Sequence, residues 1–253
     1  MPATVNPLAL DGKRVLVTGA SSGIGRATAL LLTRLGASVT FAGRRTDALA
    51  AARAEAESPD AHAVAAFDLA DADAVPGWMR ELASQAGPFH GVVHAAGVGG
   101  ATPLRTLSRR AVEAVAVPNV YATLALLRGV ASKGVAADGC SVVLLSSAAA
   151  LVGAPGLVAY SATKGAVQAI VRSAALELRG RRMRVNAVAP GYVATPMMEQ
   201  SRDQLPGFAE AVARQFLGVL EPREVASAVA YLLSDATARV TGTTLVIDGG
   251  FTL

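Results

Sequence analysis

A tyrosine and a lysine stand four residues apart in a helical pattern, at Tyr160 and Lys164. Residues at positions i and i+4 lie on one face of a helix, so we expect the ammonium beside the phenol. A phenol with a pKa of about 10 is a poor acid–base group at neutral pH, and a nearby cation lowers that pKa. The pair therefore predicts proton transfer by Tyr160. The same spacing also arises on ordinary helices, where Tyr160 would be a half-buried packing residue.

Ser147 lies thirteen residues before Tyr160, just after an apolar strand pattern. Open α/β sheets bind their ligands at the carboxyl ends of their strands, so this serine is expected at the same edge as Tyr160. Its hydroxyl is suited to donate to a substrate oxygen on which charge develops. Ser146 is the neighbouring alternative.

A glycine-rich turn, from Thr18 to Gly25, follows the first strand pattern and opens a helix. Glycines permit a tight turn and let the backbone approach a pyrophosphate, which the free N–H groups of the helix N-terminus then bind. The spacing is GxxxGxG and not the commoner GxGxxG, and the alternative is a plain strand-to-helix turn. The predicted cofactor contacts in this turn are Gly19, Ser21, Ser22, Gly23, Ile24 and Gly25.

The end of the second strand pattern indicates which dinucleotide would bind. NAD sites usually carry a carboxylate about 20 residues after the glycines, where it binds the ribose hydroxyls. Here that position is Gly43, and Arg44 and Arg45 follow. A guanidinium suits a 2′-phosphate, which predicts NADP(H); the alternative is a solvated arginine pair. Asp68 and its neighbour Leu69 end the third strand and are expected at the adenine side, unless Asp68 only stabilises its own loop.

The elements that must position these residues alternate between short apolar runs and helical patterns. This alternation predicts an α/β, doubly wound Rossmann-type fold, with a seven-stranded parallel sheet and helices on both faces. We expect one domain over 1–253 and a substrate lid at about 195–221. The expected strands are 14–18, 38–42, 62–67, 90–95, 141–146, 183–188 and 245–247, and the expected helices are 23–35, 46–57, 71–85, 107–131, 157–178 and 222–234.

Composition narrows the class of protein. Hydrophobic residues make up 52% of 253 and charged residues only 17%, which excludes intrinsic disorder. A single cysteine, Cys140, excludes an intrachain disulfide, and with no signal peptide pattern it favours the cytoplasm.

The uncharged stretch 139–163 contains serines, glycines and a proline, so we expect a buried strand, a loop and a helix start and no membrane span. The net charge of +4 comes without a nucleic-acid-binding module, and no histidine lies at ligand spacing from acidic residues, so we expect no nucleic acid and no metal.

Taken together, these motifs resemble the short-chain dehydrogenase/reductase family, in its branch of about 250 residues, over nearly the whole chain. Within that family the pattern is most similar to 3-oxoacyl-thioester (acyl carrier protein) reductases. The matching features are the turn 18–25, Asn119, Ser147, the run 160–164, the run 184–191, Thr195 and the run 248–250. One departure is His94-Ala95-Ala96-Gly97, where the family often has Asn-Asn-Ala-Gly, which puts local hydrogen bonding in doubt.

The resemblance implies roles for these residues. Tyr160 would exchange the proton, Lys164 would lower its pKa and hold the nicotinamide ribose, and Ser147 would polarise the carbonyl. Asn119 would hold a water in a proton relay through Lys164. Further implied cofactor contacts are Ala96, Gly97, Pro190, Gly191, Val193 and Thr195. His94 is expected to be a hydrogen-bonded strand-end residue and not a catalytic base.

The sequence therefore predicts an NADPH-dependent reductase of a 3-oxoacyl thioester, which an acyl carrier protein could carry, or of another hydrophobic ketone. Two alternatives stay open: an NAD-linked alcohol or hydroxysteroid dehydrogenase, and a nucleotide-sensing protein without catalysis. The resemblance also implies a homotetramer. The apolar C-terminus, with Phe251 and Leu253, is expected to be buried against a neighbouring subunit.

Overall fold

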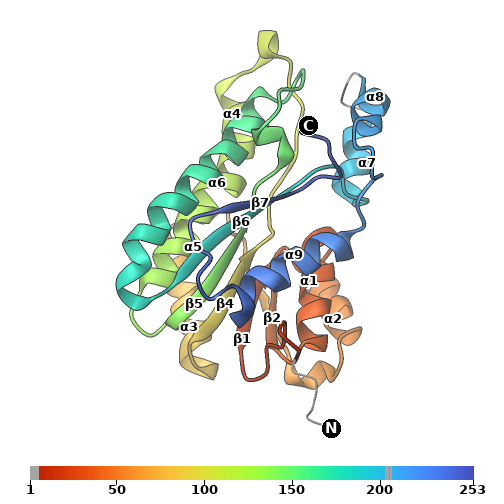
Figure 1. Cartoon of the computed structure of the whole chain (residues 1–253). Coiled ribbons are helices and arrows are strands. Elements are labelled where there is room, and N and C mark those ends of the chain that lie inside the picture. Colours follow the sequence, from red (N-terminus) through yellow and green to blue (C-terminus); the bar gives the residue numbers. More distant parts are fainter. Residues whose placement is uncertain (1–5, 203–204, 206) are drawn as a thin grey trace.

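The computed structural model describes residues 6–202, 205 and 207–253. Its centre is a parallel sheet of seven strands in the order β3-β2-β1-β4-β5-β6-β7 (Figure 1). The strands are β1 (Arg14–Thr18), β2 (Ser38–Gly43), β3 (Ala63–Ala66), β4 (Phe89–His94), β5 (Ala136–Leu145), β6 (Arg184–Pro190) and β7 (Thr244–Ile247). The helices are α1 (Gly23–Arg34), α2 (Thr46–Ala54), α3 (Val75–Ala86), α4 (Arg109–Ala116), α5 (Ala122–Ala131), α6 (Val158–Glu177), α7 (Pro196–Arg202), α8 (Phe208–Ala213) and α9 (Pro222–Leu233).

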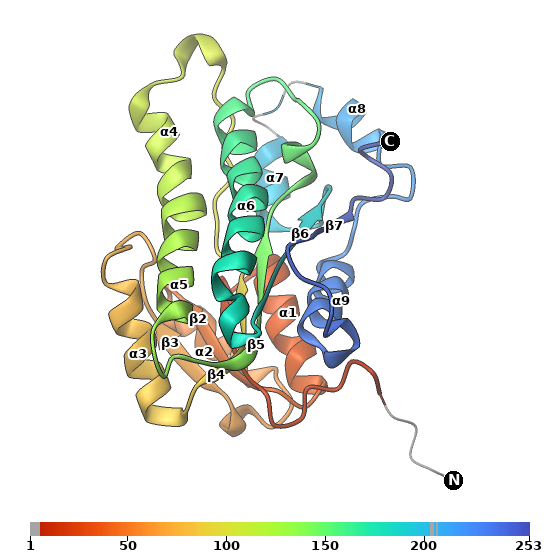
Figure 2. The ribbon, with the colours of Figure 1, turned by 60° about the vertical axis from the view of Figure 1, so that its left-hand side comes forward.

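Helices cover both faces of the sheet, as the near-continuous apolar strands predict (Figure 2). One face packs on α1, α2 and α9, through buried side chains such as Phe41, Leu32 and Val229. The other packs on α3, α5 and α6, through side chains such as Met79 and Leu126. The predicted doubly wound fold is therefore confirmed. Since every strand is parallel, all the carboxyl ends meet at one edge of the sheet.

The long helix expected at 107–131 is interrupted. A π-helical turn, Val117–Tyr121, separates α4 from α5. Pro118 lies in the first positions of this turn, and a proline has no N–H for the ordinary helical hydrogen bond. The turn holds Asn119, which is 2% exposed, against the edge of the sheet. The interruption therefore lies at a residue that the sequence assigns to the site.

The expected lid at 195–221 is less irregular than the sequence suggests. It contains α7 and α8, and its part at 203, 204 and 206 lies outside the described residues. Its two ends are held together, because Val193 pairs with Leu220 in an isolated parallel bridge.

Two apolar stretches invite a membrane interpretation. Within the described ranges, one helical stretch, Arg109–Ala131, is long and apolar enough to cross a membrane, but half of its most apolar window is buried inside the fold. In this fold it is a core helix. The uncharged stretch 139–163 forms the end of β5, a loop and the start of α6, as expected. Its Cys140 is 1% exposed, and burial raises the pKa of this thiol to about 12.

Candidate active site

Two adjoining hollows lie at the carboxyl ends of the strands. The larger, of about 770 Å³, contains the glycine turn, the ends of β2 and β3, and the start of α4. The smaller, of about 170 Å³, contains Ser147, Tyr160, Lys164 and residues of the lid. Both hollows include Ile24, Ala95, Gly97, Thr195 and Met197, so a ligand in the larger one can present an end to the smaller one.

The glycine turn has the geometry that close approach to a phosphate needs. Gly19 has a left-handed φ of +70°, and a Cβ atom there would lie 2.7 Å from the main-chain nitrogen of Ala96. Ser22 is the N-cap of α1, but its side chain makes no cap hydrogen bond, and the first turn carries no acidic residue. The N-terminal N–H groups of α1 therefore face the larger hollow without a side-chain competitor, which fits a bound pyrophosphate.

Thr195 lies against this turn from the opposite side of the hollow. A Cβ atom at Gly23 would lie 3.2 Å from Thr195 Cγ2. The Thr195 hydroxyl donates to the main-chain oxygen of Val193 at 3.2 Å and accepts from the N–H of Met198 at 3.3 Å. The residues expected near the nicotinamide therefore hold each other in place at the point where the two hollows meet.

The predicted adenosine-side residues also line the larger hollow. Arg44 and Arg45 are exposed there, and neither forms an ion pair within the described ranges. Asp68 accepts a hydrogen bond from the N–H of Ala70 at 3.0 Å, so one carboxylate oxygen stabilises its own loop. Leu69 is 8% exposed and supports the same wall.

His94 takes the place of an asparagine at the end of β4. It is 3% exposed, and its Nδ1 atom lies 2.9 Å from the hydroxyl oxygen of Thr18. That oxygen also accepts from the N–H of Ala96 at 3.3 Å. Burial, with a smaller contribution from the charge of Lys164, lowers the pKa of His94 to about 3. His94 is therefore a neutral residue that links β4 to β1, which confirms the expected hydrogen-bonded strand-end role.

Asn119 ties the π-helical turn to the segment after β4. Its Oδ1 atom accepts from the N–H of Val98 at 2.9 Å, and its amide donates to the main-chain oxygen of Val98 at 3.0 Å. The amide also donates to the Thr163 hydroxyl at 3.1 Å, one residue before Lys164. A Cβ atom at Gly97 would lie 2.9 Å from Asn119 Oδ1 and 3.5 Å from Lys164 Nζ, so glycine is needed for this approach.

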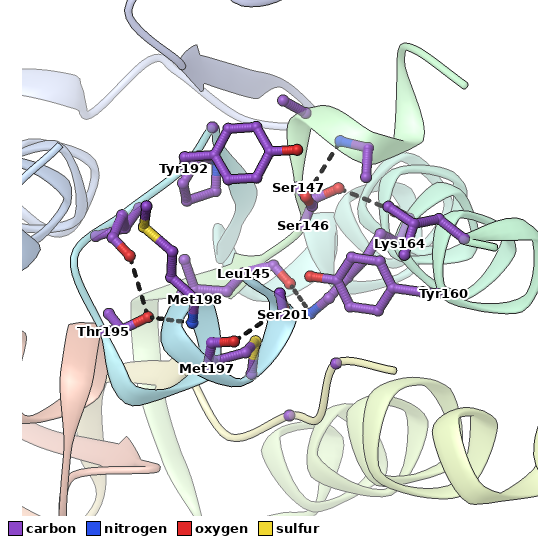
Figure 3. Close-up of a pocket in the computed structure, with 18 of the residues that line it drawn as sticks. Leu145, Ser146, Ser147, Tyr160, Lys164, Tyr192, Thr195, Met197, Met198 and Ser201 are labelled. Carbon is purple, nitrogen blue, oxygen red and sulfur yellow. Dashed lines mark hydrogen bonds between the residues drawn. The ribbon is translucent and has the colours of Figure 1, made fainter. Parts of the chain in front are cut away.

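Ser147, Tyr160 and Lys164 lie around one end of the smaller hollow (Figure 3). The Ser147 oxygen accepts from the N–H of Ala149 at 3.1 Å, which orients the hydroxyl, whereas the Ser146 hydroxyl donates to the main-chain oxygen of Lys164. The Ser146 hydroxyl is therefore committed to the main chain, whereas the Ser147 hydroxyl keeps its proton for another acceptor.

The electrostatics of the tyrosine differ from the expectation. Burial raises the pKa of the Tyr160 phenol, and a hydrogen bond with Ser147 acts in the opposite direction. The Lys164 Nζ atom lies 5.8 Å from the centre of the Tyr160 ring and donates to the main-chain oxygen of Leu145 at 2.9 Å. Burial lowers the pKa of Lys164 itself to about 8. In this state Tyr160 holds its proton at neutral pH, as a proton donor must.

The rest of the smaller hollow is mainly apolar. Its walls come from the loop after β4, the loop after β5, the lid and the C-terminus, with side chains that include Val152, Leu157, Met197, Met198 and Phe251. Of the described residues that line it, Lys164 is the only one with an acidic or basic side chain, and Tyr192 adds a phenol. The sequence analysis assigned no site role to Tyr192, Phe251 or the segment after Gly97, since they carry no local motif.

The two apolar residues at the C-terminus, Phe251 and Leu253, lie in different surroundings. Phe251 is 6% exposed within its own chain, where its ring meets that of Tyr192 at 5.3 Å and the guanidinium of Arg214 at 5.0 Å. Leu253, in contrast, is 94% exposed. The hydrophobicity of Phe251 is therefore accounted for by packing within its own chain, while burial of Leu253 against a neighbouring subunit stays a prediction.

A doubly wound sheet with a phosphate-binding turn beside a tyrosine, lysine and serine defines an oxidoreductase that uses a nicotinamide cofactor, NAD(P)(H). Comparison with known proteins agrees. A family model described as enoyl-(acyl carrier protein) reductase matches residues 19–252. The chain belongs to the short-chain dehydrogenase/reductase family.

Individual relatives differ in the reactions that their names describe. The chain is 36% identical to glucose 1-dehydrogenase of Gluconobacter oxydans, over 96% of this chain and 92% of that protein. It is 34% identical to a 3-oxoacyl-[acyl-carrier-protein] reductase of Thermotoga maritima, over 96% and 99% of the two chains. A short-chain dehydrogenase/reductase structure from Brucella melitensis aligns with a TM-score of 0.88 at 30% identity, over 96% of this chain and 98% of that one. The family is thus clear, while the substrate has to be argued from this chain's own site.

Proposed function

We propose that this protein reduces an uncharged, largely hydrophobic ketone to a secondary alcohol with NADPH. The observation that carries the proposal is the placement of the Ser147 and Tyr160 hydroxyls together in a mostly apolar hollow that adjoins the dinucleotide cleft. Two hydroxyl groups at one point are what a carbonyl oxygen needs when it becomes an alcohol oxygen.

In the proposed reaction the π bond of the carbonyl breaks. The hydride that NADPH supplies adds to the carbon, and the proton of Tyr160 adds to the oxygen. Ser147 donates to that oxygen while negative charge develops on it. Lys164 returns a proton to Tyr160 and draws on a relay that passes Asn119. The buried phenol, whose pKa is raised, keeps its proton until the oxygen becomes basic enough to take it.

The preference for NADPH rests on the end of β2. No carboxylate stands at Gly43, and Arg44 and Arg45, which form no ion pair with any residue that the structure describes, line the cleft next to it. A carboxylate would repel a 2′-phosphate, whereas an arginine binds one with a forked pair of donors.

The substrate proposal rests on the lining of the smaller hollow. A carboxylate or phosphate placed there would meet no described cation other than Lys164, and burial of an unpaired charge is costly. The 3-oxoacyl group of a thioester, free or carried by an acyl carrier protein, is such an uncharged ketone. The similarity to glucose and threitol dehydrogenases favours a second candidate, NAD-linked oxidation of an alcohol.

From the family resemblance we further propose that residues 1–253 form one catalytic domain, that the protein is a homotetramer, and that it is located in the cytoplasm.

The test is a panel of 3-oxoacyl thioesters, 3-oxo esters, cyclic ketones, steroid ketones and sugars, each measured with NADPH and with NADH. We expect the highest kcat/KM for an uncharged open-chain ketone with NADPH. A higher kcat/KM for alcohol oxidation with NAD would establish the second candidate. Binding of NADPH without turnover of any compound would instead indicate the nucleotide-sensing alternative.

A further inference from the structure

Tyr192 is held in one position by both its ring and its main chain. It follows β6 directly after Gly191, and its ring makes edge-to-face contacts with Phe208 at 5.4 Å and Phe251 at 5.3 Å. Its main-chain N–H donates to the side-chain oxygen of Gln215 at 2.8 Å, and its main-chain oxygen accepts from the amide of Gln215 at 3.0 Å. These contacts fix the direction in which the phenol points.

The phenol of Tyr192 points into the substrate hollow. Figure 3 shows its hydroxyl directed across the space toward Ser147, and both residues line the same hollow. The hydroxyl has no hydrogen-bond partner among the residues that the structure describes. Burial raises the pKa of Tyr192, with a smaller opposite effect of Arg214, so the group is a neutral donor at physiological pH.

The other hydroxyls of the lid and its surroundings already donate to this chain. Ser201 donates to the main-chain oxygen of Met197 at 2.9 Å, and Thr195 donates to that of Val193 at 3.2 Å. Ser146 donates to the main-chain oxygen of Lys164 at 2.9 Å. Ser147 and Tyr160 are assigned to the reacting carbonyl. Among the other described residues of this hollow, Tyr192 is therefore the one whose hydroxyl is free to donate to a substrate.

A free donor in an apolar wall selects for a matching acceptor. A substrate with an oxygen opposite Tyr192 gains a hydrogen bond, whereas a substrate with a methylene there leaves a buried donor without a partner. A charged acceptor is disfavoured, because Arg214, the cation that acts on the pKa of Tyr192, packs on the Phe251 ring and does not line the hollow.

We propose that Tyr192 selects the substrate by donating a hydrogen bond to a second, uncharged oxygen, while Ser147 and Tyr160 hold the oxygen of the reacting ketone. The substrate class is then a ketone with a nearby ester, thioester or amide carbonyl. This inference rests on the proposed reductase function and narrows it from hydrophobic ketones to neutral 1,3-dicarbonyl compounds.

The experiment compares two substrates and two enzymes. The substrates are a 3-oxo ester and the ketone in which a methylene replaces the ester carbonyl. The enzymes are wild type and Tyr192→Phe, which keeps the ring and its contacts with Phe208 and Phe251. We expect Tyr192→Phe to lower kcat/KM for the 3-oxo ester by about 3- to 10-fold and to raise that for the plain ketone, because phenylalanine has no donor to leave without a partner. The KM for NADPH should not change.

Phe251→Leu is the matched control, because it loosens the packing of the Tyr192 ring without removing the hydroxyl. We expect this variant to lower kcat/KM for the two ketones by the same factor. An equal effect of Tyr192→Phe on both ketones, or no effect on either, would overturn the proposal for Tyr192 and leave the reductase function in place. If wild type reduced neither ketone with either cofactor, the reductase function itself would fail, and this inference with it.

Discussion

The side chain of Lys164 reaches back from α6 to the last residue of β5, where its Nζ atom donates to the main-chain oxygen of Leu145 at 2.9 Å. The Ser146 hydroxyl donates in return to the main-chain oxygen of Lys164, also at 2.9 Å. Helix and strand are therefore joined in both directions at the point where the reaction is proposed to take place. Burial also disfavours the charged form of the Lys164 side chain, and it lowers the pKa of Lys164 to about 8.

This pKa predicts a pH dependence of stability. Lys164 loses its proton near pH 8 in the folded protein and near its ordinary value of 10.5 in the unfolded protein. Between these values the unfolded state binds more protons, so the contribution of Lys164 to the free energy of unfolding rises with pH. Lys164→Met removes this contribution. We therefore expect the Tm of wild type, relative to that of Lys164→Met, to increase from pH 8 to pH 10.

Thermal unfolding of the cofactor-free protein at several pH values provides the measurement. Lys133→Met is the control, because Lys133 is exposed, and its Tm relative to wild type should not vary over this range. A constant difference between wild type and Lys164→Met would show that Lys164 titrates at its ordinary pKa.

Tyr160→Phe should lower kcat by about 10²- to 10⁴-fold, since it removes the proton donor and keeps the shape of the ring. The affinity for NADPH, measured by fluorescence titration, should be unchanged. Tyr231→Phe, on the exposed face of α9, is the control and should keep wild-type activity. Retention of more than about a tenth of the wild-type rate by Tyr160→Phe would contradict the role assigned to Tyr160.

Arg44→Ala should lower kcat/KM for NADPH by about 10- to 100-fold and leave kcat/KM for NADH nearly unchanged. A hydrogen bond to a charged group contributes about 1.5–3 kcal/mol, and 1.4 kcal/mol corresponds to a factor of ten. Exposure of the site favours the lower half of the range, and the preference should shrink with added salt. Arg45→Ala is the matched control with a smaller expected effect.

Gly43→Asp should go further and make NADH the preferred cofactor. The position accepts a side chain, because a Cβ atom there would meet only Leu49, at an ordinary contact distance of 3.4 Å. The measurement is kcat/KM with each cofactor at fixed ionic strength. Equal values for the two cofactors in wild type would mean that the end of β2 does not select between them.

Phe251→Ala should lower the free energy of unfolding by about 3 kcal/mol, since it opens a cavity beside Tyr192. Deletion of Leu253 alone, which is 94% exposed, should change neither stability nor kinetics. Urea unfolding measures the first effect, and light scattering checks that the assembly state is the same in each variant. If Phe251→Ala instead changed the assembly state without changing stability, Phe251 would belong to a subunit interface.

The strands could be predicted from the sequence because burial on both faces leaves unbroken apolar runs. The start of β5 is the exception. The apolar pattern predicts a start at 141, whereas the strand begins at Ala136. Ala136 pairs with Phe89, and the register then shifts before Gly91 pairs with Ser141. The charged Asp138 and Gly139, which has no side chain, lie within this irregularity, so the apolar pattern begins later than the strand does.

Site residues that belong to a short sequence motif could be predicted, whereas residues that meet only in the folded chain could not. The glycine turn and the pair Tyr160 and Lys164 are recognisable because each motif is short and its members are close in sequence. Tyr192 and Phe251 meet only after the lid has folded over the edge of the sheet, and no spacing encodes that contact. Hydrophobicity at Phe251 indicates burial but not the partner, which is why the sequence suggested a neighbouring subunit.

Because Cys140 is buried, we expect the wild-type protein to react hardly at all with thiol reagents. The chain has no other cysteine, and a thiol with a pKa of about 12 and 1% exposure offers hardly any thiolate at neutral pH. A cysteine introduced on the lid, for example Ser201→Cys, would therefore accept a fluorophore or spin label at a single place. Spectroscopy on such a sample would follow the mobility and surroundings of the lid as cofactor and ketone bind, with no background substitution required.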